Sequence, residues 1–139
     1  MSDPSCLFCK IAEKKIGAAV IYEDEGAVAF LDIHPRAPGH TLVIPKAHVS
    51  KLTDLADPEI TPLFLAAKRV AKMLEKSLSP DGLTIGINQG EASGQVVGHL
   101  HVHLLPRFFN DGGGSVQSVV ESVGKESIEE MAAKIRKAK

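Results

Sequence analysis

The chain has 139 residues, of which 44% are hydrophobic and 24% are charged. This length suits one domain with a buried core, and the composition excludes a largely disordered chain. The formal net charge of −1 argues against a nucleic-acid polymer as the partner, because phosphate backbones are met by an excess of Lys and Arg. No stretch approaches the ~20 apolar residues of a membrane span and no signal-peptide pattern precedes Cys6, so we expect a cytoplasmic protein without membrane contact.

The first half of the chain predicts three strands. Apolar runs at 20–23 and 27–31 flank the turn-forming Asp24-Glu25-Gly26, which predicts a β-hairpin. The run 41–45 predicts a third strand, which Pro45 closes.

The segment from Asp57 to Ser77 repeats apolar residues every three or four positions, which predicts an amphipathic helix. We expect Asp57 or Thr61 to cap this helix, with Pro58 or Pro62 in its first turn. Its apolar positions are Leu63, Phe64, Ala67, Val70, Ala71 and Leu74.

Two further strands and a short helix are predicted after this segment. The strands are expected at 83–88 and 98–106, and Ser127 with Glu130 forms a capping box before a C-terminal helix. Strands, a long helix and strands again indicate an α+β fold with a mostly antiparallel, five-stranded sheet.

Three histidines occupy alternate positions in the run His99-Leu100-His101-Val102-His103. Alternate residues of a strand share a face, so we expect a row of imidazoles at ~6.6 Å spacing that faces solvent or a ligand, with the intervening apolar residues in the core. A purely structural role for the whole row is disfavoured, because histidine is not a favoured strand residue.

Imidazole suits phosphate chemistry, because its pKa near ~6.5 lets one ring be neutral and nucleophilic while its neighbour is cationic. His101 can attack phosphorus, and His103 or His99 can bind phosphoryl oxygens or pass a proton to the leaving group. A zinc site made by all three rings is the alternative, although strand neighbours two apart fit one tetrahedral shell imperfectly.

A glycine-bearing loop, residues 88–98, leads directly into the histidine row. We expect its backbone amides at Gly94 and Gln95 to approach an anion, as in phosphate-binding nests. Such a loop would hold a phosphate within reach of the nucleophile His101.

These motifs together resemble the histidine-triad (HIT) family, in its small nucleotide-binding, phosphoramidate-hydrolase branch of microbial type. The H-x-H-x-H-x-x signature is present at 99–105 and is followed by Pro106-Arg107, as in many microbial members. The resemblance extends from about Cys6 to Arg107. It includes Cys6-Leu7-Phe8-Cys9-Lys10-Ile11, Phe30-Leu31-Asp32-Ile33, Gly39-His40-Thr41-Leu42-Val43-Ile44-Pro45-Lys46 and His48.

The resemblance implies a homodimer of helix-backed antiparallel sheets that binds a purine nucleoside monophosphate in a cleft. It implies a base slot, a ribose contact and a phosphate site beside His101. The base slot would be lined by Phe8, Ile16, Phe30 and Ile33. Asp32 would accept hydrogen bonds from the ribose hydroxyls. The α-phosphate would be held by Asn88, Gly94, Gln95 and the backbone around Val96, with His103 beside it.

The implied mechanism is double displacement that requires no metal. His101 attacks the α-phosphorus, the leaving group departs with a proton, and water then releases the nucleotidyl group. The chain departs from the branch at Val96, where a Ser or Thr hydroxyl is usual, at Gly98, where a bulkier residue is usual, and in the tail after Arg107, which does not match that of the animal members.

The two cysteines, Cys6 and Cys9, have the C-x-x-C spacing. Redox catalysis is not expected, because no βαβ pattern surrounds them. In microbial relatives with this motif two thiolates and two histidines hold structural zinc, and the matching histidines here are His48 and His99. Two buried free thiols are the alternative.

We therefore expect one domain over 1–139, with its core at about 6–107 and a tail and helix at 108–139. The expected activity is hydrolysis or nucleotidyl transfer at the α-phosphate of purine nucleoside phosphoramidates or acyl-nucleotides such as AMP derivatives, through a covalent nucleotidyl-histidine. A dinucleoside-polyphosphate hydrolase shares the triad and is one alternative, and a nucleotide-binding or scaffold protein with weak catalysis, which Val96 favours, is another. His34 and His40 are expected to be structural or solvent-facing.

Overall fold

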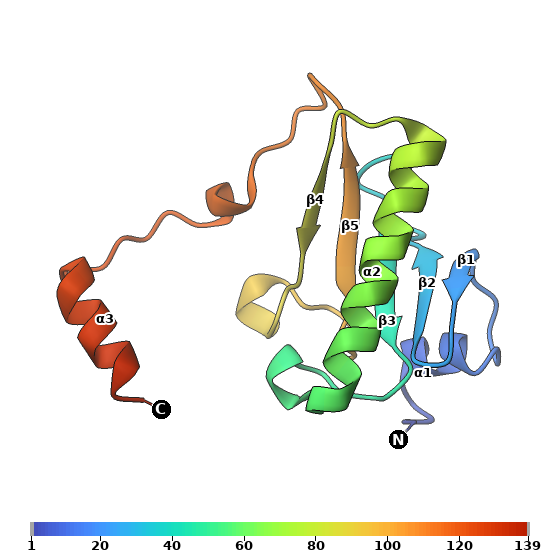
Figure 1. Cartoon of the computed structure of the whole chain (residues 1–139), viewed down its shortest axis with the longest axis horizontal. Helices are drawn as coiled ribbons and strands as arrows, with labels where there is room; N and C mark the ends of the chain where they lie inside the picture. Colours follow the sequence, from blue (N-terminus) through green and yellow to red (C-terminus); the bar gives the residue numbers. More distant parts are fainter. Residues whose placement is uncertain (1, 139) are drawn as a thin grey trace.

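A five-stranded antiparallel sheet forms the centre of the molecule. The computed structural model describes residues 2–138, and its strands are ordered β1-β2-β3-β5-β4 (Figure 1). Every neighbouring pair is antiparallel. The strands are β1 (Val20–Glu23), β2 (Ala27–Leu31), β3 (Thr41–Pro45), β4 (Gly82–Gly86) and β5 (Val102–Arg107). The predicted α+β class with a five-stranded antiparallel sheet is confirmed.

The predicted bounds of the strands are confirmed for the first three and differ for the last two. In the β1–β2 turn, Asp24 accepts hydrogen bonds from the N–H groups of Gly26 and Ala27, at 2.9 and 2.8 Å. The fourth strand ends at Gly86, and the fifth begins at Val102 instead of residue 98. Only His103 of the three motif histidines therefore lies in a strand.

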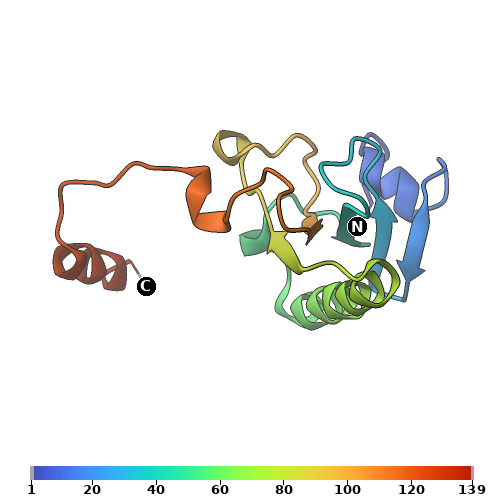
Figure 2. The ribbon, with the colours of Figure 1, turned by 90° about the horizontal axis from the view of Figure 1, so that it is seen from above.

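The long helix α2 (Asp57–Leu78) covers one face of the sheet (Figure 2). The main core between them includes Ala27, Ala29, Val43, Leu63, Ala66, Val70, Leu74, Leu100, Val102 and Leu104. The predicted cap is wrong, because Ala56 is the N-cap and makes no side-chain cap hydrogen bond. Asp57 lies in the first turn, where its negative charge interacts favourably with the positive end of the helix dipole. Phe64 is 41% exposed, because its neighbour Leu63 takes the position that faces the sheet.

A short helix that the sequence analysis did not predict, α1 (Leu7–Ala12), packs on the opposite face (Figure 2). Successive residues of a strand point to opposite faces, so β2 and β3 serve both layers. The second core is formed by Cys6, Phe8, Cys9, Ile11, Val28, Phe30, Leu42 and Ile44. This smaller layer lies next to the histidine motif.

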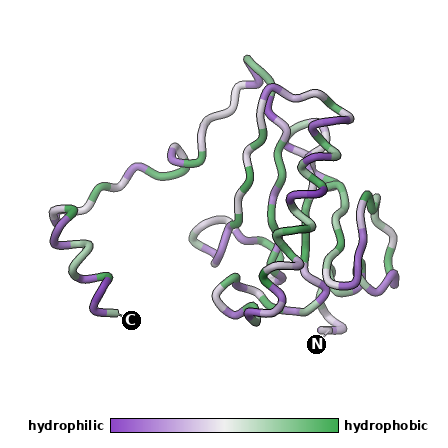
Figure 3. The backbone as a smooth tube through the Cα atoms, viewed as in Figure 1, coloured by the Kyte–Doolittle hydropathy of each residue, from purple (hydrophilic) through white to green (hydrophobic). Residues whose placement is uncertain are grey.

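The chain after Arg107 leaves the sheet as a C-terminal arm, residues 108–138, which extends away from the body (Figures 1 and 2). It contains the 3₁₀ helix η3 (Val116–Val119) and the helix α3 (Ile128–Arg136), whose predicted capping box between Ser127 and Glu130 is confirmed. Residues 109–138 are exposed, apart from half-buried Ala132. Hydrophobic positions recur along this exposed arm (Figure 3).

The root of the arm is fixed by Arg107. Its guanidinium pairs with Asp111 at 2.7 and 3.0 Å and donates hydrogen bonds to Thr84 Oγ1 at 3.0 Å and to the Gly114 carbonyl at 2.6 Å. The start of the arm is thereby tied to β4. Within residues 2–138, no helix combines the length and the apolar character needed to cross a bilayer.

Candidate functional site

The three motif histidines do not form a solvent-facing row. The ring of His99 is fully buried and His101 is 7% exposed, whereas His103, in β5, is half-buried. The expectation that all three lie in one strand is wrong, because the backbone is not yet a strand at His99 and His101, and Phe8 of α1 packs against both of these rings. The intervening Leu100 and Val102 lie in the main core, as predicted.

His101 is held by the backbone of its neighbour in the motif. Its Nδ1 donates a hydrogen bond to the His99 carbonyl at 2.7 Å, because a carbonyl can only accept. In the neutral ring, Nε2 then carries the lone pair and is the nucleophilic nitrogen. The ring packs edge-on against Phe8 and His103, with centroid distances of 5.3 and 4.9 Å.

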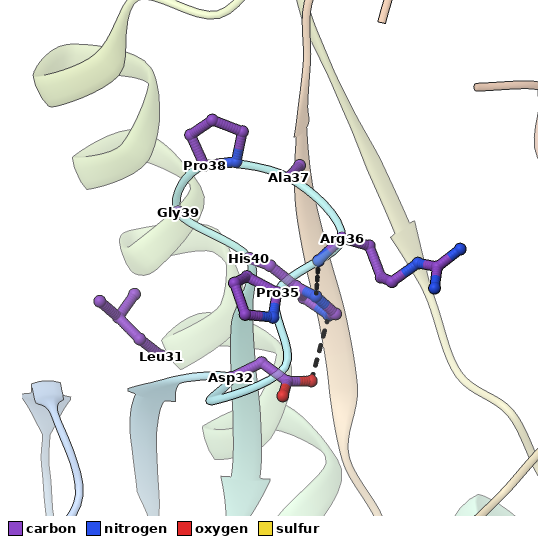
Figure 4. Close-up of a pocket in the computed structure, with 8 residues that line it drawn as sticks. All are labelled: Leu31, Asp32, Pro35, Arg36, Ala37, Pro38, Gly39 and His40. Atoms are coloured by element: carbon purple, nitrogen blue, oxygen red, sulfur yellow. Dashed lines mark hydrogen bonds and ion pairs between the residues drawn. The ribbon is translucent and has the colours of Figure 1, made fainter. Parts of the chain in front are cut away.

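His103 has the opposite arrangement, which is set by His40. The backbone N–H of Arg36 donates to His40 Nδ1 at 3.1 Å (Figure 4). His40 therefore carries its proton on Nε2, and this N–H donates a hydrogen bond to His103 Nδ1 at 2.9 Å. His103 Nδ1 is thus an acceptor, and Nε2–H is the donor on the other side of its ring. His40 is 4% exposed, so it does not face solvent, and its ring is hydrogen-bonded to His103.

Burial keeps these two rings neutral. Burial, with the neighbouring rings of His101 and His40, lowers the pKa of His103 to about 4, and burial also lowers the pKa of His40. His103 is therefore a neutral hydrogen-bond donor at pH 7. His40 was missed as a site residue because its contact depends on the pairing of β3 with β5, in which Leu42 lies opposite His103.

The loop before His40 is shaped by a glycine. Gly39 has φ +80°, and a Cβ there would overlap the side chain of Leu78. The loop Leu31–His40 encloses a small pocket, and Asp32 Oδ2 lies 3.7 Å from His40 Nε2 (Figure 4). Only glycine accepts both the positive φ and the close approach, so it directs the chain back to place His40.

The four predicted zinc ligands lie together. Their ligand atoms in Cys6, Cys9, His48 and His99 are all within 4.8 Å of one another. His99 Nδ1 lies 3.4 and 3.5 Å from the two sulfurs, and His48 Nδ1 lies 3.3 Å from Cys9 Sγ. Both cysteines are buried free thiols, as in the alternative, and the two histidine rings lie against them.

The tautomer of His99 fits a metal ligand. His99 Nε2–H donates to the Pro45 carbonyl at 2.8 Å, so the lone pair on Nδ1 points toward the sulfurs. A ligating imidazole typically gives its second N–H to a carbonyl or carboxylate in this way. For His48, Nε2 lies 3.7 Å from Asp3 Oδ2, which is too long for a hydrogen bond, and Nδ1 lies on the side of Cys9 Sγ.

A second group, Asp32, His40 and His103, also has ligand atoms within 4.8 Å of one another. Here the tautomers oppose a metal, because Arg36 N–H occupies the lone pair of His40 Nδ1 and leaves a proton on Nε2. The hydrogen bonds of this group fix the positions of its protons, whereas the Cys₂His₂ group brings together the sulfur and nitrogen atoms that suit zinc.

Two of the four expected base-slot residues come together. Phe8 and Phe30 are buried and meet edge-to-face with centroids 5.3 Å apart. Ile16 and Ile33 are 37% and 83% exposed, and none of the four residues lines either the pocket of the loop 31–40 or the groove beside His103. The apolar wall next to His101 is therefore formed by the two aromatic rings.

The glycine loop differs from the expected phosphate nest. The N–H groups of Gly94 and Gln95 donate to the carbonyls of Glu91 and Gly90, at 2.9 and 3.2 Å. The Gln95 side chain accepts from Gly90 N–H and donates to the carbonyls of Ser50 and Val97. Both groups are used to hold the loop, because the chain makes a 3₁₀ turn there, η2 (Glu91–Ser93).

A groove of about 820 Å³ opens beside His103. It is lined by Asn88 and His40 on the sheet side and by Val116 and Val119 of the arm. The side chain of Val96 is 93% exposed. His103 is thus one of the residues that a ligand in this groove would meet.

Comparison with known proteins agrees with this geometry. The model of the HIT domain matches residues 13–110. A HIT-like protein of Methanocaldococcus jannaschii is 45% identical over 107 residues, which is 77% of this chain and 82% of the relative. The bis(5'-nucleosyl)-tetraphosphatase (asymmetrical) of Schizosaccharomyces pombe is 41% identical over 92 residues, which is 66% of this chain and 50% of that enzyme.

Solved structures extend the likeness over nearly the whole chain. A HIT family protein from Bacillus subtilis has a TM-score of 0.84 at 35% identity, covering 96% of this chain and 94% of its own. A zinc-bound histidine triad family protein from Mycobacterium smegmatis has a TM-score of 0.73 at 34% identity, covering 97% and 98%. Because the HIT domain model matches more than half of the chain and these solved HIT proteins share its fold, this protein belongs to the HIT family.

Proposed function

We propose that this protein is a nucleotide-binding hydrolase that cleaves purine nucleoside phosphoramidates or acyl-nucleotides at the α-phosphate. The observation that carries the proposal is the opposite arrangement of two adjacent rings. His101 presents a lone pair on Nε2, and His103 presents an N–H, because their Nδ1 atoms are held by the His99 carbonyl and by His40. One nucleophile beside one donor is what transfer of a phosphoryl group needs.

The reaction proceeds in two displacements. His101 Nε2 forms a bond to the α-phosphorus as the bond to the leaving group breaks, and the leaving group takes its proton from solvent. The Nε2–H of His103 donates a hydrogen bond to a phosphoryl oxygen where charge builds up. Water then attacks the nucleotidyl-histidine, the N–P bond breaks, and a nucleoside monophosphate is released. A neutral His103 fits a donor of hydrogen bonds better than a general acid.

The role of His99 in this scheme differs from the expected one. Its ring is used by the Cys₂His₂ cluster and by Pro45, so it neither binds phosphate nor transfers a proton. Its backbone carbonyl instead holds His101. Phe8 and Phe30 supply the wall for the base, Asp32 binds the ribose, and Asn88 with the backbone around Val96 faces the phosphate.

A dinucleoside-polyphosphate hydrolase is the second candidate, because the S. pombe relative carries that name. Purified protein should be assayed on adenosine phosphoramidate and on diadenosine tetraphosphate, and the covalent nucleotidyl-histidine trapped and located by mass spectrometry. We expect higher kcat/KM on the phosphoramidate and a modified His101. A preference for the dinucleotide would select the second candidate, and the absence of any adduct would reject both.

We also propose that the Cys₂His₂ cluster binds structural zinc. Two thiolates and two imidazoles match tetrahedral zinc chemistry, and the M. smegmatis relative is a zinc-bound protein. Zinc there would join α1 to the sheet through Cys6 and Cys9. The proposed hydrolysis needs no metal at His101.

A homodimer is the third proposal. Four apolar side chains of the C-terminal arm are exposed: Val119 (83%), Val123 (95%), Ile128 (84%) and Ile135 (65%). A helix as short as α3 is marginally stable in water unless its apolar face is covered. A second copy is the proposed cover, with the chain as one domain over 1–139 whose core is at about 6–107. Light scattering should give a dimer for the full chain and a monomer for Ile128→Asp/Ile135→Asp. Lys134→Gln is the control, and a monomeric parent chain would reject the proposal.

A further inference from the structure

His99 takes part in both centres of this protein. Its ring contributes Nδ1 to the Cys₂His₂ cluster, 3.4 Å from Cys6 Sγ and 3.5 Å from Cys9 Sγ. Its backbone carbonyl, in the same residue, accepts the 2.7 Å hydrogen bond from His101 Nδ1. A shift of His99 therefore moves the group that determines which nitrogen of His101 is nucleophilic.

Phe8 provides a second connection between the centres. It lies between Cys6 and Cys9 in a single turn of α1, and its ring contacts Phe30 and His101, each at a centroid distance of 5.3 Å. Two of the four cluster ligands thus flank the aromatic wall. A change at either sulfur therefore acts on the same helical turn that carries Phe8.

The segment that carries Phe8 is weakly held by its own local structure. The helix α1 has six residues, and isolated helices shorter than about 12 residues are marginal in water. It lies on the smaller core, and the cluster joins it to His48 after β3 and to His99 before β5. A cation at the cluster would add bonds between these segments to the apolar packing of the smaller core and the contacts of 3.3 to 3.5 Å.

We propose that Cys6, Cys9 and His48 are positioning residues for the nucleotide site, which act through His99 and Phe8. Metal occupancy and nucleoside monophosphate binding are then energetically coupled. This inference rests on the proposed nucleotide binding beside His101, and it assigns the Cys₂His₂ cluster a role beyond holding the fold.

The coupling has a measurable size and is reciprocal. Linked sites in proteins typically change each other's affinity by about 5- to 150-fold, and the two changes must be equal. We expect metal to strengthen AMP binding by about tenfold or more, and AMP to strengthen metal binding by the same factor. A metal that only stabilised the fold would not respond to AMP in the folded, loaded protein.

The experiment uses the full chain loaded with Co²⁺, whose absorption reports a thiolate-containing site. The release of Co²⁺ to a chelator is followed with and without AMP, and AMP affinity is measured by calorimetry before and after chelation and after zinc is restored. Circular dichroism checks that the chelated protein stays folded. Cys9→Ser removes one ligand, and Lys10→Ala in the same helix is the matched control that leaves both affinities unchanged.

A second readout does not depend on nucleotide. In protein labelled with 4-fluorophenylalanine, the fluorine signal of Phe8 should shift or broaden on chelation, whereas that of Phe64 on the outer side of α2 should not. Equal AMP affinity of the loaded and chelated folded forms would overturn the inference and leave the proposed function intact. If neither form binds AMP the proposed function fails, and an unchanged Phe8 signal would then reject the positioning role as well.

Discussion

His40 donates a hydrogen bond from Nε2 to Nδ1 of His103 at 2.9 Å, although the two residues are 63 positions apart in the chain. The direction of this bond is set by the Arg36 N–H on the other nitrogen of His40. The pair therefore leaves the proton of His103 on Nε2, and His103 is one of the residues that line the groove.

Replacing His40 tests this arrangement. In His40→Phe the ring volume is kept but the donor is lost, so His103 no longer has a fixed tautomer. We expect kcat on a phosphoramidate substrate to fall about 10- to 100-fold, as for other residues that orient a functional imidazole, with a smaller change in KM. Steady-state kinetics measure both constants. His34→Ala, an exposed residue of the same loop, is the control, and equal kcat in the two variants would contradict the role of His40.

The pKa of His103 predicts a pH dependence of stability. Its pKa is lowered from 6.5 to about 4 in the folded chain, so between these values the unfolded chain binds the additional proton. The contribution of a neutral His103 is complete above about pH 6.5 and is lost as the pH falls through about 4. Urea unfolding from pH 7 to 4 should show that His103→Gln gains stability relative to the parent as the pH falls. A difference that is independent of pH would show that the ring titrates normally.

His101 is predicted to supply a bond and not only a contact. His101→Ala or His101→Gly should abolish turnover, while binding of AMP is largely retained, because the phosphate and base contacts of the other residues persist. Calorimetry for AMP and a turnover assay separate the two effects. Turnover near the parental rate in either variant would reject His101 as the nucleophile.

The Cys₂His₂ cluster predicts one zinc ion per chain. Elemental analysis of purified protein should find it, and Cys9→Ser or His48→Ala should lower both the zinc content and the melting temperature, because metal bound only to the folded state stabilises that state. Lys10→Ala should keep its zinc. Purified parent protein without zinc that also takes up none would refute the site.

Val96 is predicted to limit catalysis. A hydrogen-bond donor placed where phosphoryl charge builds up can contribute ~3 kcal/mol, and valine has no donor. Because the side chain is 93% exposed, Val96→Ser should leave the fold intact and raise kcat/KM toward phosphoramidates. Val96→Ala changes size without adding a hydroxyl and is the control. Unchanged kinetics in the serine variant would mean that a backbone donor or water already performs this task.

The sequence by itself determined the elements whose signals are local. The β1–β2 hairpin follows from apolar runs around Asp24, the helix α2 from its period of three to four residues, and the start of α3 from the capping box of Ser127. The four cluster residues followed from resemblance and not from spacing. The extent of β5 was overestimated, because alternation alone does not reveal where backbone pairing begins.

Only the tertiary structure decided what each histidine does. Which nitrogen of His101 is free depends on a carbonyl, and which nitrogen of His103 is free depends on His40, a partner brought near by the pairing of β3 with β5. His99 has its ring in one centre and its carbonyl in the other for the same reason. A sequence motif specifies residue types and their order, but the tautomer of an imidazole is set by its hydrogen-bond partners in three dimensions.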